Sequence, residues 1–378
     1  MKNILICIDW YLPAYEAGGP IQSIVNLTDH LSDDICFWIY TSNTDLNKKL
    51  KLPKHKLNCW VKVEKNKVFY SDTNSLDFRS ILNIIKTKNF DAVYLNSMFS
   101  LKFSLVPLLI AKLFKIKIFF APRGMLGDGA LSFKKYKKSI FIKLFKLLGL
   151  HHNIIWHSTD ITEKEEIKIN FGEKSLVYNA PNLSKKVKKA FNFKYKNENH
   201  LCLFYLSRIS PKKNLLMILE LLNKIDVTIN LEFDIIGPID DEKYWSKCLK
   251  QIKLLNNNIS VSYLGSIPNN KINEILKTKH LMILPTLHEN FGHVIVDSWQ
   301  IGCPVIISKN TPWKNLEEKN IGFDIDINDV QSFIDKLNYF GYMSQKKFNL
   351  YSKSSYDFGV KLSINNDVIS QMKKIFNQ

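Results

Sequence analysis

Residues 281–308 read LMILPTLHENFGHVIVDSWQIGCPVIIS, and this stretch decides the fold. Its first four residues, 281–284, form an apolar run ended by a proline, which is typical of a buried parallel strand. From Asn290 the apolar residues recur at helical spacing until Gly302, and residues 304–307 begin a second apolar run. The stretch therefore predicts a strand, a polar loop, a helix from Asn290 and another strand, which together are the repeating unit of an α/β fold.

Two acidic residues make this unit a candidate binding site. Glu289 follows the first strand, at the edge where open α/β sheets bind ligands, and the amino end of the next helix suits a diphosphate. Gly292 permits a close backbone approach, and Asp297 lies eight residues beyond Glu289, about 12 Å along a helix. Two carboxylates so far apart could hold opposite ends of one ligand. From these acids alone, a surface Glu and a helix Asp that only solubilise the unit remain an equal alternative.

The charge of the chain is uneven. The sequence has 378 residues, 46% of them hydrophobic and 12% aromatic, which predicts two or three ordered domains. The net charge is +18, and residues 1–190 hold 30 Lys and Arg against 16 Asp and Glu. Such an excess implies an anionic partner: a nucleic acid, an acidic lipid surface or a phosphorylated substrate.

Cysteine spacing and hydropathy limit the cellular setting. The six cysteines are widely spaced without a C-x-x-C pair, so we interpret them as reduced core residues, with neither disulfides nor a zinc site. The amino end lacks the apolar core of a signal peptide, and the most apolar segment, 103–111, is too short to span a bilayer. We therefore expect a cytoplasmic chain without a transmembrane helix.

The first half begins like a Rossmann domain, with an apolar strand at 3–9, a loop containing Gly18 and Gly19, and a helix at 21–31. These glycines permit backbone contact with a phosphate or sugar. Because the spacing is not G-x-G-x-x-G, a plain turn is an equal alternative. Further strands are predicted at 35–41, 61–70, 92–95, 117–121 and 154–157, and further helices at 75–88, 101–114 and 159–169.

Two of these strands end in polar residues: Asn96-Ser97 follows 92–95, and Arg123-Gly124 follows 117–121. Side chains at that edge face the ligand crevice in such folds, and Arg123 beside a glycine indicates an anion contact. A turn-forming Asn and a surface Arg are the alternatives.

Residues 131–148 predict a basic amphipathic helix with six lysines among eight large apolar residues. The helix could belong to the core with a solvated lysine face, or it could dock on a membrane surface, which the lysine density favours.

After a polar stretch at 178–199, which we interpret as a domain linker, the rhythm of strand, loop and helix restarts. Strands are predicted at 201–206, 232–236 and 261–264, and helices at 215–224, 241–255 and 270–277. Arg208 and Lys213, in the loop after the first of these strands, are natural partners for a diphosphate. The predicted domains are 1–190 and 191–355, and residues 356–378 form a helix that crosses back to the first domain.

The chain resembles a family-4 glycosyltransferase of the GT-B type, in which two Rossmann-like domains face each other across a cleft. The motifs that carry the resemblance span nearly the whole chain: Gly18-Gly19-Pro20, the Arg208 to Lys213 spacing, Gly237-Pro238, Gly265-Ser266-Ile267-Pro268, and Glu289-Asn290-Phe291-Gly292 with an acid eight positions on. The last resembles the E-x7-E motif of the family.

The resemblance implies that Arg208 and Lys213 neutralise the donor diphosphate, that Glu289 contacts the donor sugar, and that Asp297 binds the ribose hydroxyls. The rest of the implied donor side is Gly18, Gly19, Gly237, Ile267, Asn290, Phe291 and Gly292. The acceptor-side candidates are Asn96, Ser97, Arg123 and Gly124. Asp297 replaces the usual Glu and is one methylene shorter, while Asn96 and Arg123-Gly124 stand where many members carry His and His-Gly.

The chemistry implied is retaining transfer, in which the departing diphosphate oxygen takes the acceptor proton, so no protein base is assigned and no metal or cofactor is needed. The donor would be a UDP- or GDP-sugar. The acceptor would be a glycan or lipid-linked glycan of cell-surface polysaccharide synthesis, at the inner face of the plasma membrane. One alternative is a GT-B sugar-nucleotide epimerase or hydrolase. A basic nucleic-acid-binding protein is disfavoured because no recognised nucleic-acid motif occurs.

Overall fold

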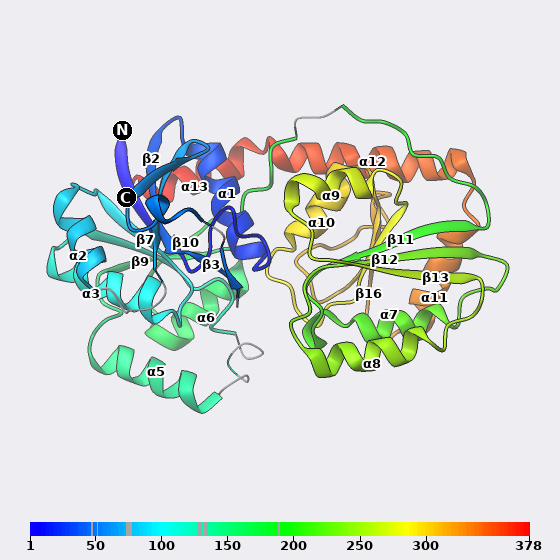
Figure 1. Cartoon of the computed structure of the whole chain (residues 1–378), viewed down its shortest axis with the longest axis horizontal. Coiled ribbons are helices and arrows are strands. Elements are labelled where there is room, and N and C mark those ends of the chain that lie inside the picture. Colours follow the sequence, from blue (N-terminus) through cyan, green and yellow to red (C-terminus); the bar gives the residue numbers. More distant parts are fainter. Residues whose placement is uncertain (47, 51, 73–77, 128–130, 132–134, 188–189) are drawn as a thin grey trace. The chain divides into compact units, whose positions relative to one another are not determined.

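The protein is described by a computed structural model that covers residues 1–378 except 47, 51, 73–77, 128–130, 132–134 and 188–189. The chain forms two compact units (Figure 1). Unit 1 contains Met1–Leu183 and Asn365–Gln378, and unit 2 contains Ser184–Ile364. Each unit has one large parallel sheet with helices on both faces, so the predicted α/β class is confirmed.

The sheet of unit 1 has the strand order β10-β9-β8-β7-β1-β2-β6-β5, and all neighbours are parallel except β5 and β6. Side-chain alternation along β1 sends Leu5 into one core and Ile4 and Ile6 into the other, as expected of a strand buried on both faces. The strands are β1 Lys2–Cys7, β2 Ile35–Ser42, β5 Trp60–Val63, β6 Asn66–Ser71, β7 Ala92–Asn96, β8 Lys117–Ala121, β9 Ile154–Ser158 and β10 Leu176–Asn179, with the small pair β3 Thr44–Asp45 and β4 Lys48–Lys49 beside them.

The helices of unit 1 complete its two cores. The helices are α1 Gly19–Leu31, α2 Phe78–Thr87, a π-helix at Leu101–Leu105 followed by α3 Val106–Leu113, α5 Lys135–Leu147, α6 Ile161–Phe171 and α13 Asn366–Phe376. The chain returns to unit 1 in α13, whose Met372, Ile375 and Phe376 are buried against the strands. Phe376 makes edge-to-face contacts with Phe37 and Phe119, which anchor the end of the chain.

Unit 2 has a six-stranded, wholly parallel sheet of order β13-β12-β11-β14-β15-β16. Its strands are β11 His200–Leu206, β12 Asn230–Ile236, β13 Ile259–Gly265, β14 Leu281–Leu284, β15 Val305–Ser308 and β16 Gly322–Ile325. Its helices are α7 Leu215–Leu222, α8 Glu242–Ile252, α9 Asn269–Leu276, α10 His293–Gln300, α11 Val330–Gly341 and α12 Gln345–Ser363. Because β11 and β14 are neighbours, the loops that follow them meet at one edge of the sheet.

Several predicted elements differ from the structure. The strand predicted at 61–70 is an antiparallel hairpin, because Glu64 adopts a positive φ of 52° and turns the chain between β5 and β6. The helix predicted at 101–114 begins as a π-helix, since Pro107 has no N–H to donate to the preceding turn. The helix predicted from Asn290 begins only at His293, after Gly292 with φ 76°. Strand β10 lies partly inside the predicted linker, and β16 and α11 were not predicted.

The boundaries of the units also differ from the predicted domains. They fall at Leu183 and Ile364 instead of 190 and 355. The single helix predicted from Tyr356 is wrong, because Tyr356 lies inside α12. Ile364 leaves the helical conformation, and the Asn365 side chain accepts hydrogen bonds from the Asp367 and Val368 N–H groups to start α13. The first residues of the helices predicted at 75–88 and 131–148 lie in part outside the described residues.

Candidate functional site

Three loops at the carboxyl edge of the unit 2 sheet are joined by hydrogen bonds. The Leu287 N–H donates to the Lys212 carbonyl at 2.9 Å, and the Thr286 hydroxyl donates to the same oxygen at 3.2 Å. The Glu289 N–H donates to the Asn310 carbonyl at 3.0 Å. The loop after β14 is therefore held against the loops that follow β11 and β15.

This arrangement brings Lys213 and Glu289 together. The Lys213 ammonium contacts the Glu289 carboxylate, and the two side chains are only 12% and 17% exposed. The predicted proximity of these residues is thus confirmed. A charge-assisted pair in such a half-desolvated position fixes both head groups, so each keeps one orientation at the edge where a ligand would bind.

Asp297 lies on α10, where its carboxylate makes no hydrogen bond or ion pair with any residue that the structure describes. Burial raises its pKa from 3.8 to about 6, while the positive charge of Lys185 acts in the opposite direction. The distance of about 12 Å predicted from a continuous helix does not apply, because Gly292 separates Glu289 from the helix. An unpaired carboxylate at this position can accept hydrogen bonds from hydroxyl groups of a ligand.

Arg208 is already paired with an acid. Its Nη1 lies 3.2 Å from Asp240 Oδ2, and both side chains are more than one third exposed. The Arg208 carbonyl accepts a hydrogen bond from the buried Tyr205 hydroxyl at 2.7 Å. The prediction did not include Asp240, although its place directly after β12 and Gly237-Pro238 put it at the same edge of the sheet.

The glycines of unit 2 are required by close contacts. A Cβ on Gly237 would lie 1.9 Å from the Ser207 carbonyl oxygen, and one on Gly292 would lie 2.7 Å from Ile295 Cδ1. Gly237 is therefore required for the close approach of the ends of β11 and β12, independently of any contact with a ligand. Ile267 is partly buried against the core of unit 2, so its side chain is committed to packing.

Phe291 is positioned by a residue that sequence reasoning missed. The Trp313 indole N–H donates to the Phe291 carbonyl at 2.5 Å, and the two rings meet edge to face at 5.4 Å. Trp313 lies five residues after β15. Its position beyond the carboxyl end of a predicted strand could have indicated that it lies near the site. The side chains of Asn290 and Phe291 thus belong to a loop that is fixed from both sides.

The glycine loop of unit 1 is held by an acidic residue. One Asp45 carboxylate accepts hydrogen bonds from the N–H groups of Tyr15, Glu16 and Ala17 at 2.7, 2.9 and 3.3 Å. Gly18 then adopts φ 69° and caps α1, and Gly19 is the first residue of that helix. Asp45 was not predicted, because a contact across about thirty residues leaves no local pattern in the sequence.

The four acceptor-side candidates of unit 1 do lie together. Arg123 donates to the Asn96 side-chain oxygen from Nε at 3.1 Å and from Nη2 at 2.9 Å. Ser97 and Arg123 both have positive φ, 83° and 60°, which is uncommon outside glycine. The Gly124 N–H donates to Glu163 Oε1 at 2.6 Å, so it is already bonded within the protein. Sequence reasoning missed Asn182 and Tyr94, which also contact Arg123.

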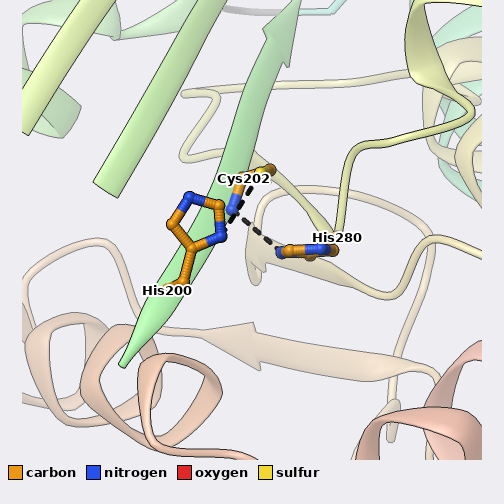
Figure 2. A group of neighbouring side chains, drawn as sticks. All are labelled: His200, Cys202 and His280. Atoms are coloured by element: carbon orange, nitrogen blue, oxygen red, sulfur yellow. Dashed lines mark hydrogen bonds between the residues drawn. The ribbon is translucent and has the colours of Figure 1, made fainter. Parts of the chain in front are cut away.

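One group of metal-ligating side chains lies at the opposite, amino-terminal edge of the unit 2 sheet. His200, Cys202 and His280 have donor atoms within 4.8 Å of one another (Figure 2). His280 Nδ1 accepts from the Cys202 N–H at 3.0 Å, and its Nε2 donates to the Tyr195 carbonyl at 2.8 Å. Both ring nitrogens are therefore used by the backbone.

The surroundings of this group also disfavour a cation. Burial, aided by Glu232, raises the pKa of the Cys202 thiol to about 11, which keeps it protonated at neutral pH. Burial lowers the pKa of His280 to about 3, and the charges of Lys196 and Lys194 lower it further. The geometry fits a hydrogen-bonded buried cluster better than a metal centre.

Comparisons with known proteins find a family match within unit 2. Residues 186–352 match the family described as "Glycosyl transferases group 1". A curated relative from Klebsiella pneumoniae, described as an uncharacterized 41.2 kDa protein in the cps region, is 24% identical over 239 residues. That match covers 61% of this chain and 63% of the relative, which is less than two thirds of the relative's length.

Solved structures resemble the chain over its full length. Anabaena HepE in complex with UDP and glucose has a TM-score of 0.72 at 15% identity, and both chains are covered completely. Sucrose-phosphate synthase from Thermosynechococcus elongatus has a TM-score of 0.72 at 14% identity, covering 100% of this chain and 99% of that one. WaaG, a glycosyltransferase of lipopolysaccharide biosynthesis, has a TM-score of 0.65 at 11% identity, covering 98% of each chain. The chain therefore has a GT-B fold, and its residues 186–352 match the group 1 glycosyltransferase family.

Proposed function

We propose that the protein is a retaining glycosyltransferase that moves a sugar from a nucleotide-diphosphate sugar to a glycan or lipid-linked glycan in cell-surface polysaccharide synthesis. The observation that carries the proposal is the Lys213–Glu289 pair within the group 1 domain. Lys213 and Arg208 would neutralise the charge that develops on the departing diphosphate, and Glu289 would hold the donor sugar. Preorganised charges of this kind supply the largest part of many rate enhancements.

The choice of donor rests on the relatives. HepE has been solved with UDP and with UDP-glucose, which makes a UDP-sugar the first donor to test in this protein. Asp297 would accept hydrogen bonds from the ribose hydroxyls. The cps-region relative supports a polysaccharide pathway. With two cations facing the diphosphate, we expect transfer to proceed without a metal ion.

Two measurements test the proposal. UDP- and GDP-sugars are first screened for stabilisation of the protein, because a ligand at 100 times its Kd adds about 2.7 kcal/mol. The product formed from the best donor is then analysed by NMR, and we expect the anomeric configuration of the donor to be kept, with EDTA present or absent. Donor turnover to a new free sugar without an acceptor would instead show an epimerase or hydrolase. An inverted product would contradict the retaining mechanism.

A membrane surface is the second partner that we propose, and α5 carries the argument. Residues Tyr136, Ile140, Leu144 and Leu147 recur at spacings of four, four and three, so they form one stripe. They are 85, 58, 51 and 81% exposed, whereas Ile142 and Phe145 of the same helix are buried. The core therefore uses only one side of α5, and a second apolar stripe faces solvent. The lysines Lys137, Lys143 and Lys146 are exposed on the same helix.

An apolar stripe bordered by lysines fits the surface of an anionic bilayer, into which the stripe dips while the ammonium groups meet the lipid phosphates. Each lysine near such a surface contributes about 1 kcal/mol, and the attraction falls off over about 8 Å at physiological salt. No helix among the described residues is long and apolar enough to cross a bilayer, so the contact would be peripheral.

Vesicle sedimentation tests this contact with phosphatidylglycerol and phosphatidylcholine vesicles. We expect salt-sensitive binding to the anionic vesicles. Lys137, Lys143 and Lys146 changed together to Gln should weaken it roughly a hundredfold, and Ile140→Ser with Leu144→Ser should weaken it on both lipids. The matched control is Ile161→Ser with Ile169→Ser, two exposed apolar residues of α6. Equal binding to both lipids, or an equal loss in the control, would refute the proposal.

A further inference from the structure

Arg123 in unit 1 is fixed by an unusually complete set of hydrogen bonds. Its guanidinium donates to Asn96 Oδ1 twice, to Asn182 Oδ1 at 2.5 Å and to the Tyr94 hydroxyl at 2.8 Å. These four bonds use four of its five N–H groups. Asn96, Asn182 and Tyr94 are 2, 7 and 0% exposed, whereas Arg123 is only partly buried. The side chain is thus held by buried groups and reaches toward solvent.

The hydrogen bonds that link Tyr94, His157 and the Ala180 carbonyl have a defined donor-to-acceptor order. The Tyr94 hydroxyl lies 2.6 Å from His157 Nδ1, and His157 Nε2 lies 2.8 Å from the Ala180 carbonyl, to which it must donate. His157 Nδ1 is therefore an acceptor, so Tyr94 donates to it and accepts from Arg123. Burial and the charge of Arg123 lower the pKa of His157 to about 3, which keeps the imidazole neutral. All partners of Arg123 are neutral.

The positive charge of Arg123 is consequently left without a counter-charge in contact. Among the residues that the structure describes, no carboxylate oxygen lies within 4 Å of its guanidinium. The buried Glu163 carboxylate accepts from the Gly124 N–H and from the N–H and hydroxyl of Thr159. Asp9, at the end of β1, accepts from the Ser100 hydroxyl at 2.6 Å. Both carboxylates are thus hydrogen-bonded to groups other than Arg123.

Hydrogen-bond donors are in excess here. With respect to the residues that the structure describes, Arg123 keeps one unused N–H, and the Asn182 amide, whose oxygen accepts from Arg123, keeps its two N–H groups. The backbone that presents Arg123 is itself in an uncommon conformation, with positive φ at Arg123 and at the neighbouring Ser97. Such conformations cost about 1–3 kcal/mol each and concentrate at binding and active sites.

We propose that Arg123 and Asn182 bind an oxyanion of the acceptor, so that the glycan or lipid-linked glycan carries a carboxylate or a phosphate next to the sugar that is extended. The proposal rests on the glycosyltransferase function and defines its acceptor class. A spare guanidinium N–H, a positive charge without a described carboxylate in contact and two amide N–H groups together offer what a carboxylate or phosphate oxygen requires.

Binding without a donor tests this site independently of turnover. Titrations of the wild-type protein would compare methyl glucuronide, glucose 6-phosphate and neutral methyl glucoside, which separates a carboxylate from a phosphate. We expect one of the anionic ligands to bind at least tenfold more tightly than the neutral one. Arg123→Gln should remove that preference and Arg123→Lys should keep part of it. Arg79→Gln, which removes an equal charge from the exposed face of α2, should leave it unchanged.

Asn182→Ala guards against a folding defect, because it leaves the bonds from Arg123 to Asn96 and Tyr94 in place and should still reduce the preference. Equal binding of all three ligands by the wild type would refute the proposal. A loss in Arg123→Gln that is the same for the neutral and anionic ligands would also refute it, since Arg123 would then only support the fold. If the preference is present but no donor yields transfer, the oxyanion site stands and the glycosyltransferase proposal fails.

Discussion

Lys213 of unit 2 and Arg123 of unit 1 both lie in a loop that follows a parallel strand, yet they differ in the charge of their partners. Lys213 contacts the Glu289 carboxylate, so its charge is balanced inside the protein. Among the described residues, Arg123 is held by neutral oxygens alone. A balanced pair can serve a ligand that carries both hydroxyl groups and negative charge, whereas an unbalanced cation stays incomplete until an anion binds. The predictions below would break or sharpen this contrast, beginning with the largest effect.

Removing the cations of unit 2 should have the largest effect. Lys213→Ala and Arg208→Ala should each lower turnover by on the order of a hundredfold or more, because a preorganised charge facing the leaving group is lost. Folding should change little in Arg208→Ala, because that side chain is more than one third exposed, whereas Lys213→Ala leaves the largely buried Glu289 carboxylate unpaired and should also lower stability. Steady-state kinetics with circular dichroism as the folding control measures both. Wild-type turnover in both variants would remove these residues from the mechanism.

Substitutions of Glu289 and of Asp297 should affect different measured quantities, kcat for the first and nucleotide affinity for the second. Glu289→Gln should lower kcat by about tenfold or more, because the Gln amide neither pairs with Lys213 nor accepts as strongly from the sugar hydroxyls. Asp297→Asn should leave the sugar contacts intact and weaken binding of the free nucleoside diphosphate by several-fold, whereas Asp297→Glu should strengthen that binding relative to the wild type. Titration calorimetry with UDP and GDP distinguishes the variants. An affinity that is indifferent to every change at Asp297 would exclude the ribose role.

Substitution of Asp240 should have a smaller effect, and it should strengthen nucleotide binding instead of weakening it. Its carboxylate shares Arg208 at 3.2 Å, so Asp240→Asn should release that guanidinium for the diphosphate and tighten nucleotide binding by a few-fold. An exposed ion pair of this kind is worth about 0.2–1 kcal/mol, which limits the gain. The double variant Arg208→Ala with Asp240→Asn should show no gain over Arg208→Ala. If Asp240→Asn alone weakens binding, Asp240 positions Arg208 and does not compete for it.

Asp297 should also be visible in the stability of the unliganded protein. Its pKa is raised to about 6 in the folded state, so above pH 6 the native protein carries a charge that burial disfavours. Below about pH 4 the carboxyl is protonated in both states and the penalty disappears. Asp297→Asn should therefore raise the free energy of unfolding by about 1–2 kcal/mol at pH 7 and by nothing at pH 3.5. Urea unfolding at the two pH values measures this, and a pH-independent difference would contradict it.

The sequence predicted the elements near the site better than the contacts between them. Leu281–Leu284 was predicted with its observed bounds, because a short apolar run ended by proline has few other conformations. The turn at Glu64 was missed, since nothing in a glutamate signals a positive φ. Strand β10 was missed because Leu176–Asn179 is short and partly exposed, and the polar stretch taken as the linker begins within it.

Within the site, proximity along one edge of a sheet was predictable and pairing was not. The positions of Lys213 and Glu289 after neighbouring strands indicated that they meet, and they do. Asp240, Trp313 and Asp45 act through tertiary contacts with residues about 20 to 32 positions away, which no local pattern encodes. The partners of Arg123 include Tyr94 and Asn182, which only the fold brings together.

The polar stretch that joins the two units has a consequence for dissecting the enzyme. Lys194 is 7% exposed and donates to the carbonyls of Leu276 and Lys279, both at 2.9 Å. Lys196 is 2% exposed and donates to the Gly341 carbonyl at 3.0 Å, and burial lowers its pKa to about 8. Both lysines therefore stabilise unit 2 through buried hydrogen bonds, although the polar stretch in which they lie resembles a linker in composition.

A fragment cut at the first strand of unit 2, at His200, would lose these hydrogen bonds. The Gly341 carbonyl would lose the donors Lys196 and Asn199, and the Leu276 and Lys279 carbonyls would each lose one of their donors. Each unsatisfied group costs about 1–3 kcal/mol, a large share of the stability of a domain. The smallest autonomous form of unit 2 must therefore begin ahead of Lys194, at Ser184, where the chain divides. The stretch that contains Lys194 and Lys196 thus determines where an independently folding form of unit 2 can begin.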